Sequence, residues 1–111
     1  MKTEQQPPCT APDRHLLEGG LKLLADFWTL NIIDVLQGGE LRFNDIQRKV
    51  TGINPVTLVN RLKKLEQAKL VQREEETLCK LSVTYGLTKR GVRILPVIRE
   101  IQHFAEECLG K

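Results

Sequence analysis

The side chains between Asn54 and Ala68 include donors, acceptors and cations that could read a DNA major groove. Asparagine can form a bidentate pair with adenine, and a threonine or valine methyl group can contact the methyl group of thymine. Arginine and lysine supply cations for backbone phosphates. The residues of this segment that we expect to contact DNA are Asn54, Val56, Thr57, Asn60, Arg61 and Lys64.

A helix must carry these side chains on one face. Asn54 can cap the free amides of a helix start, and Pro55 suits the first turn, where its missing N–H costs nothing. Three leucines spaced four and three residues apart form an apolar stripe, at Leu58, Leu62 and Leu65. The pattern predicts a helix from Pro55 to about Ala68. Thr57, Asn60 and Lys64 then lie on the exposed face, and Arg61 lies at its border, where a phosphate contact is favoured over a base contact.

The rest of the chain supplies elements around this helix. Apolar density that ends at Gly38-Gly39 predicts a helix over 27–36, preceded by a shorter one from about Leu16. An extended step over 41–43 precedes a short helix over 45–50 that Asn44 can cap. Strands are predicted over 70–73 and 81–87, with a hairpin tip over 74–80. Thr88 should cap a long final helix that Pro96 bends about two turns in.

This order is that of a winged helix-turn-helix, a mainly α fold with a small β-hairpin, in which the third core helix can enter a major groove. An isolated amphipathic helix is more often a solvated surface helix, and it is the element order that favours DNA binding. Residues 1–13 hold three prolines and almost no large apolar side chain, so we expect a loose tail before one domain over 14–111.

Composition excludes several classes of function. The net charge of +3 is too small to prove a nucleic-acid partner by itself. No apolar run approaches the length of a membrane helix and no secretion signal is evident, which favours the cytoplasm. Three widely separated cysteines lack metal-ligand spacing, so we expect reduced thiols and no metal or cofactor. No catalytic triad or phosphate loop appears, so we expect no enzyme.

The sequence resembles the HxlR-type helix-turn-helix regulators, winged-helix transcription factors related in fold to the MarR regulators. The resemblance covers roughly residues 15–105, and the matching segments are 27–30, 39–46, 52–54, 58–66, 70–71, 85–88 and 94–97. It implies a homodimer whose two recognition helices read an inverted-repeat operator. It also implies that Arg42 contacts the DNA backbone. The hairpin cations Arg73 and Lys80 could contact the phosphates as well.

The terminal helices are the expected dimer contact, since the last helix has a broad apolar stripe and the same surface on two subunits is self-complementary. The residues assigned to this interface are Leu21, Leu24, Ile94, Val97, Ile98, Ile101, Phe104, Ala105 and Cys108.

The chain departs from the family pattern in three places. Family members that sense oxidants or electrophiles carry a cysteine where this chain has His15, and Cys9, six residues earlier, is the candidate redox sensor. Ala25-Asp26-Phe27 stands where the family usually has glycines and a lysine. Glu74, Glu75 and Glu76 place negative charge on the hairpin. An alternative function is a winged helix that binds another protein through the same surfaces.

Overall fold

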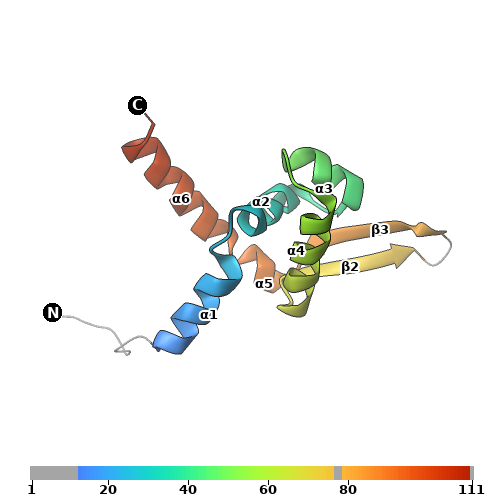
Figure 1. The fold of residues 1–111 in the computed structure, drawn as a ribbon, viewed down its shortest axis with the longest axis horizontal. Coiled ribbons are helices and arrows are strands. Elements are labelled where there is room, and N and C mark those ends of the chain that lie inside the picture. The colour runs from blue at the N-terminus through green and yellow to red at the C-terminus, as the bar shows by residue number, and fades with distance from the viewer. Residues whose placement is uncertain (1–12, 77–78, 111) are drawn as a thin grey trace.

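The structure is a computed structural model that describes residues 13–76 and 79–110, and the side chains of residues 76 and 79–82 fall outside that description. Its helices are α1 (Arg14–Leu24), α2 (Phe27–Val35), the 3-10 helix η1 (Leu36–Gly38), α3 (Phe43–Lys49), α4 (Pro55–Gln67), α5 (Lys89–Val92) and α6 (Leu95–Cys108). Its strands are β1 (Leu41–Arg42), β2 (Val71–Glu76) and β3 (Cys79–Leu87). The winged helix-turn-helix order is confirmed (Figure 1).

The first two helices begin at aspartates. Asp13 Oδ1 accepts hydrogen bonds from the backbone N–H groups of His15 and Leu16, at 2.9 and 3.3 Å, so α1 begins earlier than predicted. Asp13 therefore belongs to the folded domain, whereas the rest of the predicted tail lies outside the described residues. Asp26 caps α2 in the same way, by accepting from the N–H of Thr29 at 2.9 Å.

The two helices of the helix-turn-helix differ in how well the sequence predicted their starts. Asn44 is not a cap, because α3 already begins at Phe43 and the cap position, Arg42, makes no side-chain capping bond. The start of α4 is confirmed, with Asn54 Oδ1 accepting from the N–H of Val56 at 2.7 Å and Pro55 in the first turn.

The sheet is antiparallel in the order β1-β3-β2. Leu41 pairs with Tyr85, and Val71 pairs with Leu87. The predicted hairpin tip over 74–80 was too long, since β2 continues through the three glutamates to Glu76 and β3 already begins at Cys79. Pairing across the strands satisfies the backbone there, and β2 and β3 extend away from the helices as the wing (Figure 1).

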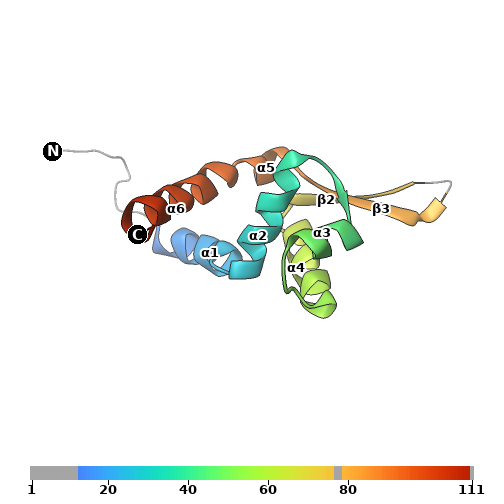
Figure 2. The same cartoon turned by 90° about the horizontal axis from the view of Figure 1, so that it is seen from above.

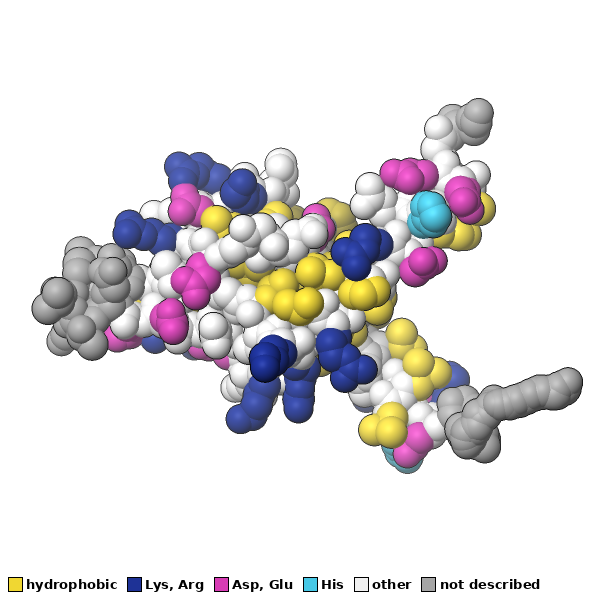
Figure 3. All heavy atoms as spheres, turned by 180° about the vertical axis from the view of Figure 1, so that it is seen from behind, with side chains coloured by type: hydrophobic (Ala, Val, Ile, Leu, Met, Phe, Trp, Pro, Cys, Tyr) yellow, Lys and Arg dark blue, Asp and Glu magenta, His cyan; other side chains and the backbone are white. Residues whose placement is uncertain are grey.

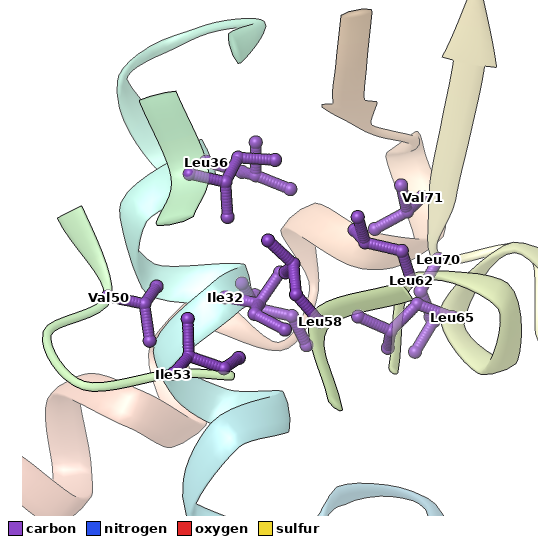
Figure 4. Packing of buried hydrophobic residues seen from close by; sticks show 11 residues of the cluster. Ile32, Leu36, Val50, Ile53, Leu58, Leu62, Leu65, Leu70 and Val71 are labelled. Atoms are coloured by element: carbon purple, nitrogen blue, oxygen red, sulfur yellow. The ribbon is translucent and has the colours of Figure 1, made fainter. Parts of the chain in front are cut away.

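The core lies between α2, α3, α4 and the base of the wing. Ile32, Ile46, Leu58 and Leu65 are fully buried. Figure 4 shows the leucines of α4 turned toward Ile32 of α2 and toward Leu70 and Val71, where β2 begins. The inner stripe of α4 is thus occupied by the core, and this fixes which face of the helix points outward.

The predicted final helix is two helices. Thr88 caps the short α5 through the N–H of Gly91, and the chain then breaks before Pro96, which lies in the first turn of α6. Proline suits that position, so it begins a helix here and does not bend one. Neither α1 nor α6 contains a buried residue, and the two helices form arms that leave the domain on the side opposite the wing (Figures 1 and 2).

Candidate nucleic-acid interface

The outer face of α4 is open along its length. Val56 is 67% exposed and Val59 38% exposed, and Asn60, Lys63 and Gln67 are exposed as well. Thr57, which the sequence predicts to be exposed, is half-buried and lies at the edge of this face. Because side chains three and four residues apart are neighbours on a helix, these residues form one surface of apolar methyl groups, amides and one cation. We call Val56, Val59, Asn60, Lys63 and Gln67 the outer face.

Arg61 is turned toward α2. Its Nε lies 2.8 Å from Oδ2 of Asp26 and its Nη2 lies 3.3 Å from Oδ1, in a fork that engages both carboxylate oxygens. The two side chains retain 31% and 27% exposure, so the ion pair is only partly shielded from water. Arg61, expected as a phosphate contact, therefore has an intramolecular partner.

Lys64 is also bound within the chain. Its Nζ donates to the backbone carbonyl oxygen of Lys22 at 3.1 Å, close to the end of α1. The sequence placed Lys64 on the exposed face, and the structure places it half-buried on the side facing α1. The cation of the outer face is instead Lys63.

The Asp26–Arg61 pair perturbs both groups. The hydrogen bond from Arg61, with further bonds from Thr29, holds the pKa of the Asp26 carboxyl well below its usual value, although burial opposes this shift. The same hydrogen bond raises the pKa of Arg61. Asp26 is therefore ionised at neutral pH.

A groove of about 400 Å³ lies beside the start of α3, and Arg42, Asn44, Asp45 and Arg48 contribute to its lining. Arg48 forms an ion pair with Asp45 one helical turn earlier. Arg42 is exposed on β1. Arg42, which the sequence predicts to contact the DNA backbone, lies next to the helix-turn-helix, on the strand that pairs with β3 of the wing.

The wing carries compensated charge. Arg73 Nη2 lies 2.9 Å from Oε2 of Glu75, and hydrogen bonds with Tyr85 and Glu75 raise the pKa of Arg73. The side chain of Lys80 lies outside the described residues. Because Glu75 neutralises Arg73, the described part of the wing offers no net positive charge to a phosphate, and the outer face of α4 is the stronger candidate.

The arms expose a second surface, which is apolar. A groove of about 390 Å³ runs between α1 and α6, and its lining includes Leu17, Leu21, Leu24, Val97 and Ile101. Leu21, Val97, Ile101 and Phe104 are each about half exposed, whereas Leu24, Ile94 and Ile98 pack partly against the core. Ala105 is half-buried and Cys108 is exposed. Hydrophobic side chains are visible on both arms in Figure 3.

Sequence reasoning missed several residues of these surfaces. Leu16 is 74% exposed on the arm α1, Phe27 is 69% exposed at the start of α2, and Val59 belongs to the outer face. An aspartate directly before an apolar helix is a recognisable cap signal, so Asp26 could have been predicted as the cap of α2. Its pairing with Arg61 has no local signal, since the two residues are 35 positions apart.

Comparison with known proteins identifies the family. The profile of the HxlR-like helix-turn-helix family matches residues 23–111. The chain belongs to this family of DNA-binding transcriptional regulators. It is 34% identical over 91 residues to the HTH-type transcriptional regulator YodB of Bacillus subtilis. The aligned residues make up 82% of this chain and 81% of the relative.

Solved structures agree. The reduced form of YodB superposes with a TM-score of 0.77 at 32% identity, and covers 87% of this chain and 95% of that one. A MarR-family regulator from Porphyromonas gingivalis has a TM-score of 0.79 at 28% identity, over 88% of this chain and 96% of its own. The reduced redox regulator HypR has a TM-score of 0.76 at 25% identity, over 83% of this chain and 91% of its own.

In the part of the chain that the structure describes, no helix is long and apolar enough to cross a bilayer. Within the same residues, no three or more His, Cys, Asp or Glu side chains are grouped so that they could hold a metal ion.

Proposed function

We propose that two copies of this chain bind an inverted-repeat operator as a homodimer, each placing the outer face of α4 in a major groove. The observation that carries the proposal is the division of α4 into two faces. Leu58, Leu62 and Leu65 are buried in the core, while the outer face, from Val56 to Gln67, is left exposed. A helix that reads base edges needs both faces.

The second copy is proposed because the arms have an apolar surface that one chain leaves uncovered. Helices of 11 and 14 residues without a single buried residue gain little from their own domain. Burying the groove between them, with Leu21 and Ile101, against the same groove of a partner would remove this apolar area from water. Two half-sites about one duplex turn apart, roughly 34 Å, follow from the symmetry.

The proposal is tested by selecting operators from random DNA with the purified protein. We expect an enriched palindrome whose binding weakens steeply with salt, by roughly 10³ to 10⁵ between 50 and 200 mM if six to ten phosphates are contacted. Binding to DNA of any sequence alike would contradict the proposal. A winged helix that binds another protein through the same face, the alternative, would show no such salt dependence on DNA.

The dimer is tested by a matched pair of charged variants. Ile101→Glu places a carboxylate in the groove between the arms, and Val92→Glu places one on α5 at a similarly exposed position, 49% against 51%. Light scattering should give a monomer for the first and a dimer for the second. An unchanged mass for Ile101→Glu would refute this interface.

Thiol regulation is a separate proposal. The relatives include a redox regulator, HypR, and Cys9 is the cysteine nearest to the position at which such family members carry one. Cys9 lies outside the described residues, and the position itself is held by His15 in the first turn of α1. Treatment with diamide should release DNA from the wild-type chain but not from Cys9→Ser, and equal release from both would exclude Cys9.

A further inference from the structure

Two cations of α4 fasten this helix to the corner between α1 and α2. Arg61 and Lys64 are three residues apart, so they lie on one side of α4. Arg61 holds the carboxylate of Asp26 through two contacts, at 2.8 and 3.3 Å, and Lys64 donates to the carbonyl oxygen of Lys22 at 3.1 Å. Ala25, between the helices, is thus bracketed by bonds to the same helix.

Both bonds go to groups at the ends of helices, the carbonyl of Lys22 near the end of α1 and the carboxylate of Asp26 that caps α2. Asp26 N–H donates to the carbonyl oxygen of Leu24, so it does not serve the carbonyl of Lys22 one turn back in α1. The Nζ of Lys64 donates to this carbonyl oxygen instead, and a cation is favourable near the negative end of the helix dipole. At the other side of the corner, Asp26 caps α2 through Thr29 and binds Arg61 with the same carboxylate.

We propose that Asp26, Arg61 and Lys64 form a joint that fixes α4 relative to the dimer arm α1, and thereby sets the spacing of half-sites that the dimer accepts. The inference rests on the proposed function, since it needs two subunits joined through their arms. In that assembly the position of α4 on α1 determines the separation of the two recognition helices. Asp26, Arg61 and Lys64 are positioning residues in this sense, and the outer face remains the reading surface.

A rigid joint has a measurable consequence. One base pair inserted at the centre of an operator moves a half-site by about 3.4 Å and rotates it by roughly 34° about the duplex axis. A dimer with α4 held firmly on the arms cannot follow this change without breaking contacts. A dimer with a loosened joint binds its best operator less tightly but discriminates less against the altered spacing.

The sign of the effect separates the joint from simple electrostatics. Asp26→Asn removes a negative charge, which by itself should tighten binding to DNA. The asparagine can still cap α2, because its side-chain oxygen accepts the Thr29 N–H, but the charged bond to Arg61 is lost. The joint therefore predicts weaker binding to the best operator where charge alone predicts stronger binding.

The test compares affinities for the selected operator and for the same operator with one central base pair added or removed. For Asp26→Asn and Arg61→Gln, the ratio of these affinities should fall about fivefold relative to wild type. The matched controls are Glu18→Gln and Arg14→Gln, which change charge by the same amount in an exposed ion pair on α1. These controls should keep the wild-type spacing preference.

An unchanged spacing preference in Asp26→Asn, with tighter binding, would overturn the joint and leave the proposed function intact. If Asp26→Asn does not fold, Lys64→Met removes the other bond and keeps the cap of α2, and a wild-type preference there would overturn the joint equally. A wild-type chain that selects no two-half operator would overturn the proposed function and the joint with it.

Discussion

The hydroxyl of Thr29 donates to Oδ2 of Asp26 at 2.8 Å, from a side chain that is fully buried. The backbone N–H of Thr29 donates to the same oxygen at 2.9 Å, and Arg61 adds its Nε from α4. One carboxylate oxygen therefore serves a helix cap, a buried hydroxyl and a long-range ion pair. The stability of this corner should depend on whether Asp26 is ionised.

Acidification should remove that contribution. The pKa of Asp26 is lowered in the folded state, so its stabilisation is present above the unfolded-state pKa of about 3.9 and is lost as pH falls from there toward the folded pKa. At neutral pH, Asp26→Asn should lower the free energy of unfolding by about 1 kcal/mol, since water partly screens the pair. Urea unfolding of both proteins at pH 7 and between pH 4 and 2 measures this. A difference that persists undiminished at low pH would contradict it.

A glycine in α5 permits close packing behind the wing. A Cβ atom at Gly91 would overlap the backbone carbonyl oxygen of Leu70 and would come within 3.2 Å of the Leu87 side chain. Since a backbone group cannot move aside easily, Gly91→Ala should lower the free energy of unfolding by about 1–3 kcal/mol. Gly19→Ala, in α1 with no atom within 4 Å, is the control and should stabilise by about 0.5–1 kcal/mol. Thermal melts compare the two, and equal effects would be evidence against the overlap.

Lys69, just after the end of α4, has a backbone conformation that glycine would adopt more readily. Lys69 has φ 64°, its N–H donates to Glu66 and the N–H of Leu70 donates to Leu65, which is the Schellman arrangement. Lys69→Gly should raise the free energy of unfolding by about 0.5–1 kcal/mol, because a Cβ is disfavoured there. Lys63→Gly, inside the same helix, should lower it by about 1 kcal/mol. Denaturant midpoints that fall for both variants would contradict the prediction.

Whether the sequence could predict an element depended on how local its signals are. The start of α4 was predictable because Asn54, Pro55 and the leucine spacing are local signals that agree with one another. The wing was predictable in type but not in length, because three consecutive glutamates resemble a solvated tip, and only pairing with β3 keeps them in a strand. The break before Pro96 was missed because the apolar pattern continues through it, and proline is compatible with both a bend and a start.

In the candidate site, too, the sequence predicts the features that depend on local periodicity and misses those that depend on tertiary contacts. The inner and outer faces of α4 follow from helical periodicity alone, and exposure agrees for Val56 and Asn60. Periodicity places Arg61 at the border of the two faces and Lys64 on the exposed one, but it cannot say whether a cation points to solvent or to a neighbouring helix. Their partners come from α1 and α2, and this tertiary arrangement leaves no trace in the local sequence.

Asn60 should read one base pair. It is exposed near the middle of the outer face, and an asparagine amide matches the donor and acceptor of adenine. Asn60→Ala should relax preference at one operator position by about 1–3 kcal/mol while the salt dependence stays the same, because no charge is lost. Selection from a library randomised across the half-site measures it. Unaltered preference at every position would remove Asn60 from the readout.

Val56 should read a thymine methyl group. It is a β-branched apolar side chain that remains 67% exposed in the first turn of α4, where neither helix propensity nor burial in the core accounts for it. Contact with a thymine methyl would remove from water apolar surface equivalent to about one methyl group in total, worth roughly 0.8 kcal/mol or about fourfold in affinity. Replacing the contacted thymine by uracil should therefore weaken wild-type binding about fourfold.

The same replacement should leave Val56→Ala nearly unaffected, because that variant has already lost the contact. Uracil placed outside the half-sites controls for changes in duplex stiffness. If every uracil within the half-sites weakens the wild type and Val56→Ala equally, the methyl groups are read by another residue, and Val59, 38% exposed one turn further along, is then the next side chain to truncate.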